Sequence, residues 1–337
     1  MTWSGDDVMS RMVNTVTGPV SSDSLGRVAM HEHFMFAFPG CQFDLATGRQ
    51  VQKKEAIDKC VEGAKLLKSQ GIDTVVDATP MDCGRNPEWL AEISIKSGVQ
   101  IICVTGYYME GFSASGYWQM KMHWAGSDGA ASQYAELLEA ELTHGMDNTD
   151  IKAGMIKVAT GHDRISDYQK MMIKGASIAH KNTGCPIYTH TEDGELGFDQ
   201  AKLFLKFGCD ASRVVIGHMC GEIRTDCHKQ ILDWGFNIGF DRLGAYDGYH
   251  PEDREKGMCL ARLIKEGYGD RIVVSQDVIH QRLGRVDPYP DFEVNEWRNY
   301  RFGYMLDTLF PMFRKEFGIT QEDTDRLLMD NPRRIFS

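Results

Sequence analysis

Residues 26–33 read GRVAMHEH, a mainly apolar run that ends with two histidines on either side of a glutamate. A short apolar run predicts a strand that is buried on both faces, as in a parallel sheet. Because side chains alternate along a strand, His31 and His33 share one face and can point into the same space. An open doubly wound sheet would carry a glycine-rich phosphate loop after its first strand, and MHEHFMF stands there instead.

Seven further runs of this kind follow, separated by longer amphipathic stretches. They lie at residues 71–80, 99–108, 154–160, 186–191, 213–219, 237–244 and 271–278. Apolar residues at helical spacing fill the gaps, most clearly at 53–69, 168–183 and 197–207. Eight strands that alternate with helices predict an α/β fold, a single (β/α)8 TIM barrel.

The domain prediction is one barrel over residues 1–337, with two additions. We expect a short N-terminal hairpin at about 12–24, before the first strand. We also expect an active-site loop at about 280–300, because this stretch follows the last strand and shows no clear period.

The composition is that of an ordinary globular protein and limits the partners. Of 337 residues, 42% are hydrophobic and 25% charged, and 37 basic against 48 acidic residues give a net charge of −11. An acidic chain without a basic stripe argues against nucleic acid, since phosphate binding needs clustered lysine and arginine. Without an apolar run that could span a bilayer or a visible secretory signal, we expect no membrane partner and a cytoplasmic location. Nine cysteines, an odd number without a CxxC pair, favour reduced thiols.

The polar residues at the ends of the predicted strands form one set. Functional groups of a TIM barrel gather at the C-terminal ends of its strands. The candidates there are His31, His33, Lys157, His190, His218 and Asp277. A lone histidine is often structural, and Asp277 could cap a helix, but six such groups at one end of five strands indicate a metal site. Imidazole and carboxylate suit divalent metals, zinc first, with iron, cobalt, manganese and nickel as alternatives.

Lys157 lies inside the apolar run GMIKVAT, where an unpaired ammonium would cost several kcal/mol. An ammonium group offers only donors and cannot ligate a metal. Carboxylation by carbon dioxide would turn Lys157 into an anion that can bridge two metals. This modification would account for both the buried charge and the number of ligands, so we expect a binuclear centre at the C-terminal end of the strands.

Six motifs occur in a specific order along nearly the whole chain. They are LGRVAMHEH at 25–33, IKVAT at 156–160, YTHT at 188–191, SRVVIGHM at 212–219, VVSQD at 273–277 and TDRLLMDNPRRIFS at 324–337. In these motifs the chain resembles the phosphotriesterase family of the amidohydrolase superfamily. The resemblance implies one more buried metal, bound by His31, His33 and Asp277, and one more exposed metal, bound by His190 and His218. It further implies that carboxylated Lys157 and a hydroxide bridge the metals, that this hydroxide attacks the substrate, and that Asp277 accepts the proton.

Two more positions are similar to the phosphotriesterase-like lactonase branch of that family. They are Tyr108 in VTGYY and Arg242 in GFDRLG. In that branch the equivalent residues orient the substrate beside the metals, so Tyr108 and Arg242 join Asp277 as catalytic candidates. The structural alternatives are rim packing for Tyr108 and, for Arg242, a salt bridge to Asp241 or another rim acid.

The resemblance implies hydrolysis of a small molecule, a lactone or a related carboxylic ester. A phosphotriester or an N-acyl amide is the alternative substrate within the same metal chemistry. A non-catalytic binding protein of the same fold is the alternative from another class. Relatives in this family are often dimers, which implies a homodimer.

Overall fold

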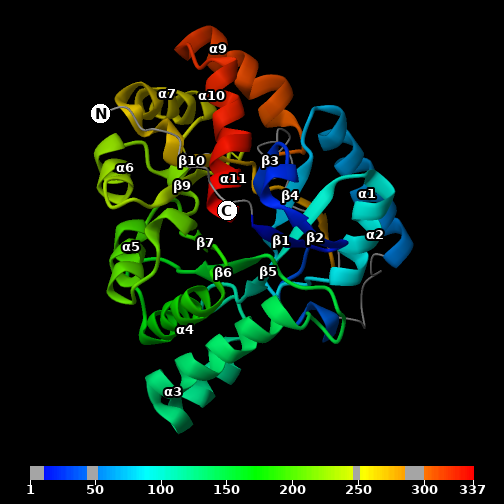
Figure 1. Cartoon of the computed structure of the whole chain (residues 1–337), viewed down its shortest axis with the longest axis vertical. Coiled ribbons are helices and arrows are strands. Elements are labelled where there is room, and N and C mark those ends of the chain that lie inside the picture. Colours follow the sequence, from blue (N-terminus) through cyan, green and yellow to red (C-terminus); the bar gives the residue numbers. More distant parts are fainter. Residues whose placement is uncertain (1–10, 44–51, 246–250, 285–299) are drawn as a thin grey trace.

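A curled parallel sheet occupies the centre of the molecule, with helices around its outside (Figure 1). The computed structural model describes residues 11–43, 52–245, 251–284 and 300–337. Within these residues the sheet has nine strands in the spatial order β10-β9-β8-β7-β6-β5-β4-β3-β11, and every neighbouring pair is parallel. Strands that follow one another in sequence are thus neighbours in space, which is the order of a TIM-barrel-like fold.

Seven of the eight predicted strand ranges contain a strand, and the first, 26–33, contains the start of one that runs on to Phe36. The strands of the sheet are β3 (Val28–Phe36), β4 (Thr74–Asp77), β5 (Gln100–Gly106), β6 (Met155–Ala159), β7 (Ile187–His190), β8 (Val214–Ile216), β9 (Asn237–Phe240), β10 (Ile272–Val274) and β11 (Ile279–Arg282). The first eight of these nine fall within or beside the apolar runs because strands buried on both faces carry apolar side chains on both sides.

The three predicted helix ranges, 53–69, 168–183 and 197–207, agree with α1, α4 and α5 to within one residue at each end. The α-helices are α1 (Lys53–Ser69), α2 (Pro87–Ser97), α3 (Ser115–Thr143), α4 (Asp167–Thr183), α5 (Gly197–Lys206), α6 (Thr225–Leu232), α7 (Asp253–Leu263), α9 (Phe310–Phe317), α10 (Gln321–Asp325) and α11 (Asn331–Phe336). α4 shows why such ends are readable. Ser166 and Gln169 form a capping box at its start, and Gly184 ends it in the left-handed conformation, with φ 70°.

The interior of the sheet at its N-terminal end is a small apolar core. It consists of Val13, Leu25, Val28, Met30, Val76, Ile102, Val104, Met155, Tyr188, Val215, Val273, Ile335 and Phe336. Val13 comes from an antiparallel hairpin of β1 (Met12–Thr15) and β2 (Gly18–Ser21), and Phe336 from α11. The hairpin and α11 therefore cover this end of the sheet (Figure 1), and the opposite end is left for the site.

The last strand differs from its prediction. The range 271–278 was expected as one strand, but β10 stops at Val274 and β11 begins at Ile279. Between them the Asp277 amide donates to the His31 carbonyl at 3.0 Å, and the His33 amide donates to the Val278 carbonyl at 2.9 Å. The chain thus leaves β10 and joins β3 directly, which brings the two edges of the sheet together.

The active-site loop expected at about 280–300 is corrected at its start for the same reason. Its first residues belong to β11, which pairs with β3 from Ile279 opposite His33 to Arg282 opposite Phe36. Residues 285–299 lie outside the described residues.

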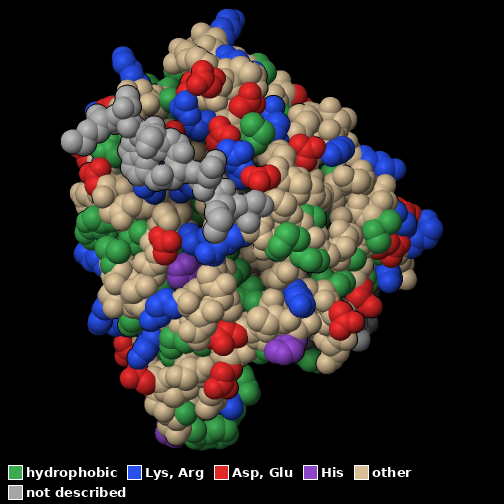
Figure 2. Space-filling view, in the orientation of Figure 1, with side chains coloured by type: hydrophobic (Ala, Val, Ile, Leu, Met, Phe, Trp, Pro, Cys, Tyr) green, Lys and Arg blue, Asp and Glu red, His purple; other side chains and the backbone are tan. Residues whose placement is uncertain are grey.

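Three further observations concern the surface, the cysteines and the hydropathy of the helices. On the face in Figure 2, basic and acidic side chains lie among one another and form no basic stripe. All nine cysteines are free thiols in the structure. Among the described residues, no helix combines the length and the apolar composition that crossing a bilayer requires.

Candidate active site

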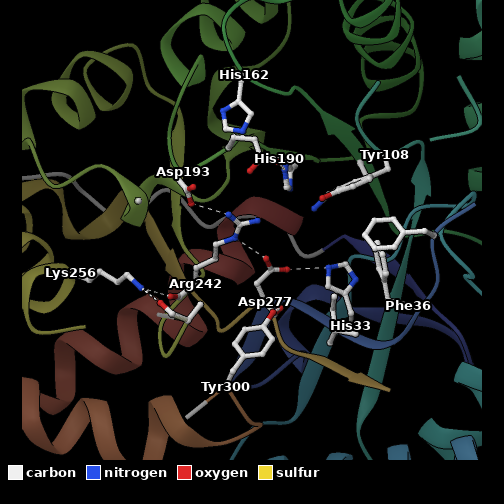
Figure 3. Close-up of a pocket in the computed structure, with 16 residues that line it drawn as sticks. His33, Phe36, Tyr108, His162, His190, Asp193, Arg242, Lys256, Asp277 and Tyr300 are labelled. Atoms are coloured by element: carbon white, nitrogen blue, oxygen red, sulfur yellow. Dashed lines mark hydrogen bonds and ion pairs between the residues drawn. The ribbon is translucent and has the colours of Figure 1, made fainter. Parts of the chain in front are cut away.

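A cavity of about 470 Å³ opens at the C-terminal ends of the strands (Figure 3). Its wall contains side chains from β3, β6 and β7 and from the segments after β5, β9 and β10. Six of the eight predicted site residues line this cavity: His33, Tyr108, Lys157, His190, Arg242 and Asp277. His31 and His218 lie directly behind this wall, with their rings 4.8 Å apart between centroids. The structure therefore brings together all eight side chains that the sequence predicted.

A bulge in β3 turns its two histidines toward the site. Val28 and Met30 point into the apolar core at the other end, so strict alternation would place His31 and His33 on the outer face. The pairing of β3 with β4 shifts register between Ala29 and Glu32. Such a shift moves the following side chains to the opposite face. His31 and His33 consequently face the interior, and Glu32 faces outward.

Three of the predicted ligands form a first group around one carboxylate oxygen. Asp277 Oδ1 lies 3.2 Å from His31 Nε2 and 3.1 Å from His33 Nε2. Lys157 Nζ lies 2.8 Å from the same nitrogen of His31. All of these side chains are buried or nearly so. One metal ion could be held here by two imidazoles and a carboxylate.

A second group adjoins the first through the same aspartate. His218 Nε2 lies 2.9 Å from His190 Nδ1 and 3.7 Å from Asp277 Oδ2. Asp277 thus presents one oxygen to each group. The predicted ligands form two adjacent sets joined by a carboxylate.

The nitrogens that face away from the site reveal the tautomer of each histidine. Asp241 accepts from Nδ1 of His31 at 3.1 Å and from Nδ1 of His218 at 3.0 Å. Thr79 Oγ1 donates to the Met35 carbonyl, so it accepts from His33 Nδ1 at 2.8 Å.

His190 shows the same arrangement with its two ring nitrogens exchanged. Glu192 Oε1 accepts from His190 Nε2 at 2.9 Å. Each of the four imidazoles therefore carries its proton on the outer nitrogen and turns the lone pair of the other nitrogen into the site. The inner nitrogens of the histidines and the carboxylate oxygens of Asp277 are all acceptors and face one another. A cation would stabilise this arrangement.

The electrostatics of the site favour these ligating forms. Burial lowers the pKa of His190 to about 3, assisted by the neighbouring His218. Burial alone would raise the pKa of Asp277, but His31 and His218 outweigh it and hold that pKa well below its usual value. Burial lowers the pKa of Lys157 to about 8, although Asp277 opposes the shift. A neutral His190, an anionic Asp277 and a partly deprotonated Lys157 are therefore accessible near neutral pH.

Two of these ligand candidates have strained backbones. His218 has φ 56° and Asp277 has φ 57°, and neither is a glycine. A non-glycine residue in the left-handed region costs about 1–3 kcal/mol, and such residues cluster at functional sites. The turns aim both side chains inward where their strands have already ended. Such conformations persist where surrounding contacts fix them, as the contacts of Asp241 and Asp277 with the histidines do here.

Asp241 is the main residue that sequence reasoning missed, since it was considered only as a salt-bridge partner of Arg242. Its side chain is fully buried and accepts from His31, His218 and the Tyr188 hydroxyl, the last at 2.7 Å. These contacts hold one histidine of each group at once. Its position inside the seventh apolar run, directly after β9 and two residues beyond Gly239, was the available signal. A Cβ at Gly239 would lie 2.4 Å from the Tyr188 hydroxyl, so this glycine leaves room for the network.

Glu32 is the second residue that was missed. It accepts from Ser275 Oγ at 2.8 Å and from the amides of Gln276 and Val278, each at 2.9 Å. Burial raises its pKa to about 8. From the outer face of β3, Glu32 therefore fastens the segment that carries Asp277.

The two predicted substrate residues lie at the wall of the cavity. The Tyr108 ring contacts His190 edge to face, with 5.1 Å between ring centroids. Arg242 Nε donates to Asp277 Oδ2 at 3.0 Å, and Nη1 donates to Asp193 Oδ1 at 2.9 Å. Of the alternative salt bridges, the one to Asp241 is not formed, because Asp241 accepts from His31 and His218. The one to another rim acid is formed, with Asp193.

The chain belongs to the phosphotriesterase family, whose model matches residues 11–336. It is similar to a phosphotriesterase homology protein of Mycobacterium tuberculosis, with 32% identity over 96% of this chain and 97% of that protein. It is also similar to an aryldialkylphosphatase of Saccharolobus solfataricus, with 26% identity over 94% and 97% of the two chains. An N-acetyltaurine hydrolase of Salmo salar is 25% identical over 97% and 98%.

Solved structures of similar proteins have the same fold. An organophosphorus hydrolase from Deinococcus radiodurans superimposes with a TM-score of 0.92 at 38% identity, over 97% of each chain. A mutant of a PTE-like lactonase from the same organism gives 0.91 at 37% identity, over 96% of this chain and 100% of that one. The family and its structural neighbours are hydrolases, and this chain is an enzyme of that class.

Proposed function

We propose that the chain is a binuclear metal-dependent hydrolase built on a single (β/α)8 TIM barrel. The proposed ligands are His31, His33 and Asp277 for one divalent metal, His190 and His218 for the other, and carboxylated Lys157 between the two. The observation that carries this proposal is the convergence of lone pairs. Four histidines donate their outer N–H groups to acceptors, so their inner nitrogens and Asp277 face one another as acceptors only.

The donor set fits zinc and similar divalent metals. Imidazole nitrogens and a carboxylate are ligands of zinc, and acceptors such as Asp241 and Glu192 behind the imidazoles raise their basicity. Lys157 fits the bridging position because its Nζ is buried among these ligands, and its lowered pKa leaves part of it as the neutral amine that adds carbon dioxide. Two divalent cations would supply a hydroxide nucleophile near neutral pH and would polarise the scissile bond.

The chain's own residues would orient the substrate and move the proton. Asp277 lies between the two groups of ligands and the guanidinium of Arg242, so it is positioned to accept a proton from the nucleophile. Arg242 and Tyr108 project from the wall on either side of His190 and would position the substrate's polar head.

A lactone or a related carboxylic ester is the proposed substrate. The lining combines a polar floor with a wall of Phe36, Phe38, Tyr108 and Ile279, which suits a short acyl chain. The similarity at 37% identity to a PTE-like lactonase supports this class. A phosphotriester is the second candidate, since the chain is 38% identical to an organophosphorus hydrolase.

An N-acyl amide is a third candidate for the same centre. The similarity to N-acetyltaurine hydrolases, at 25% identity or less, supports it more weakly. We propose a small molecule as the partner, and the homodimer stays a prediction.

The test is metal reconstitution followed by assays on matched substrates. Purified protein would be loaded with zinc, manganese or cobalt, and its metal content would be measured by plasma emission. We expect about two metals per chain and hydrolysis of a lactone panel with a higher kcat/KM than that for a paraoxon-type triester or an N-acyl amine. A reconstituted protein that retains no metal would overturn the binuclear proposal, and a preference for the triester or amide would overturn the substrate class.

A further inference from the structure

The guanidinium of Arg242 lies between two carboxylates in the cavity wall (Figure 3). Nε donates to Asp277 at 3.0 Å, and Nη1 donates to Asp193 at 2.9 Å. Asp277 belongs to the proposed ligand set, so its contact with Arg242 is a direct part of the site. Asp193 lies outside the proposed ligand set and places a negative charge on the outer side of Arg242.

Lys157 belongs to the proposed ligand set, and the other described lining residues that can carry a positive charge, Lys256 and His162, also have partners. Lys256 is buried, and its ammonium donates to the carbonyl oxygens of Arg242 and Ala245 at 2.9 and 2.6 Å. His162 pairs with Glu195 at 2.9 Å at the outer edge of the cavity. Among the described lining residues, Arg242 is therefore the cation best placed to meet an anionic group of a substrate, and Asp193 already neutralises it.

The conformation of the loop after β7 places Asp193 beside Arg242. Asp193 has φ 53°, and the next residue, Gly194, has φ 86°. On the other side, a Cβ at Gly221 would lie 2.5 Å from the Asp193 Cα atom. The absence of a side chain at Gly221 thus lets the loop lie against η4 (Met219–Gly221). The position of Asp193 beside Arg242 thus depends on the positive φ of Asp193 and Gly194 and on the missing side chain at Gly221.

We propose that Asp193 is a specificity-determining residue that keeps Arg242 from binding anions, so that the site selects acyl groups without charge. This inference rests on the proposed esterase function and narrows it to neutral substrates. A substrate with a carboxylate or sulfonate near its scissile bond would have to compete with Asp193 for the guanidinium. It would also meet the negative charges of Asp193 and Glu192, because both acids line the same cavity.

The test compares two esters that differ only in charge. 4-Nitrophenyl butyrate and 4-nitrophenyl hemisuccinate share a leaving group, and the second replaces a methyl with a carboxylate. We expect the metal-loaded wild-type protein to prefer the butyrate. In Asp193→Asn, the ratio of kcat/KM for hemisuccinate over butyrate should rise about tenfold, the order of one charge-assisted hydrogen bond. Asparagine tolerates a positive φ, so this variant keeps the backbone.

Glu195→Gln is the matched control. It removes one negative charge from the same loop, but Glu195 pairs with His162 and the Asp163 amide and does not contact Arg242. Its substrate ratio should stay within about twofold of the wild-type ratio, because exposed charges at longer range are screened. A rise as large as that of Asp193→Asn would mean that overall loop charge, and not the pairing with Arg242, sets the selectivity, and would overturn the inference.

A binding measurement separates this inference from the proposed function. Ethanesulfonate should raise the Tm of Asp193→Asn and leave that of the wild-type protein and Glu195→Gln unchanged. Failure of the wild-type protein to hydrolyse butyrate esters or lactones would overturn the proposed function. An active wild-type protein with an unchanged ratio and no Tm shift in Asp193→Asn would overturn only the role of Asp193.

Discussion

The two ends of the sheet interior differ in kind although the same strands build both. At the N-terminal end, Val28, Met30 and Val273 pack against Phe336 and other apolar side chains. At the C-terminal end of these strands, His31 and Asp277 belong to a buried polar network. Met30 and His31 are neighbours in sequence and lie on opposite sides of this division. The register shift in β3 therefore places Met30 in the apolar core and His31 in the polar site.

This difference shows where the molecule gains stability and where it gives stability up. Each apolar side chain at the closed end contributes about 1.5–3 kcal/mol by burial. At the open end, His218 and Asp277 have left-handed backbones, and buried polar groups stabilise little even when paired. Changes at the open end should therefore alter turnover and metal binding, while changes at the closed end should alter the free energy of unfolding.

The largest expected effect is that of Lys157→Ala. Loss of the proposed bridge should lower metal retention and reduce kcat at least roughly 10³-fold, because two cations would then repel each other without it. Short carboxylic acids such as propionate should partly restore turnover. Metal content and lactone hydrolysis measure both, and full activity in this variant would refute the bridging role.

The second largest effect is expected for Asp277→Asn. The amide keeps the shape of the side chain but cannot accept a proton as the carboxylate does, so kcat should fall roughly 10²–10³-fold with a smaller loss of bound metal. Plasma emission and steady-state kinetics on the same sample give the two quantities. A larger loss of metal than of turnover would mean that Asp277 serves only as a ligand.

Asp241→Asn tests the support behind the histidines. The carboxylate accepts from His31 and His218 together, and replacing such a partner of a ligating histidine costs about 10–100-fold in metal affinity or activity. Competition with a chelator would measure the affinity. Wild-type affinity would show that the ligand geometry does not need Asp241 and would remove it from the site.

Met30→Ala tests the closed end and should leave the site intact. Its buried side chain is truncated in a packed core, so the free energy of unfolding should fall by about 2–5 kcal/mol. Below the unfolding transition, kcat/KM and metal content should equal those of the wild-type protein. Urea unfolding and lactone kinetics decide this, and a parallel loss of turnover would show that the two ends are coupled.

The smallest effect concerns a buried histidine in the helical layer. Burial lowers the pKa of His228 below 6.5 although its Nε2 donates to the Met219 carbonyl at 2.8 Å. The neutral form is favoured in the folded state, so its contribution is fully present above pH 6.5 and is lost as the pH falls below that value, where the unfolded chain takes up the proton.

His228→Gln removes this titration. Urea unfolding above and below pH 6.5 should therefore show a smaller loss of stability in the variant than in the wild-type protein. Equal losses would assign the pH dependence to other groups, such as His180, whose pKa burial also lowers.

Much of the fold could be predicted because its signals are local. Apolar runs mark the strands of a parallel sheet wherever they occur, and the capping box at Ser166 and the glycine at Gly184 mark the ends of α4. The site residues could also be predicted from local sequence, since imidazole, carboxylate and a lysine in an apolar run have limited chemical uses. The break between β10 and β11 was missed, because a strand that leaves one partner for another has the same apolar sequence as a continuous one.

The sequence by itself placed the strands β3 to β10 and the helices α1, α4 and α5, and it showed which side chains carry ligand chemistry. The tertiary structure alone decided that His31 and His33 face inward, that Asp241 supports both groups of histidines, and that Arg242 pairs with Asp193. The physical reason is that these outcomes depend on register and on contacts between distant strands. A shift of one residue against β4 reverses every following side chain of β3, and no local pattern records it.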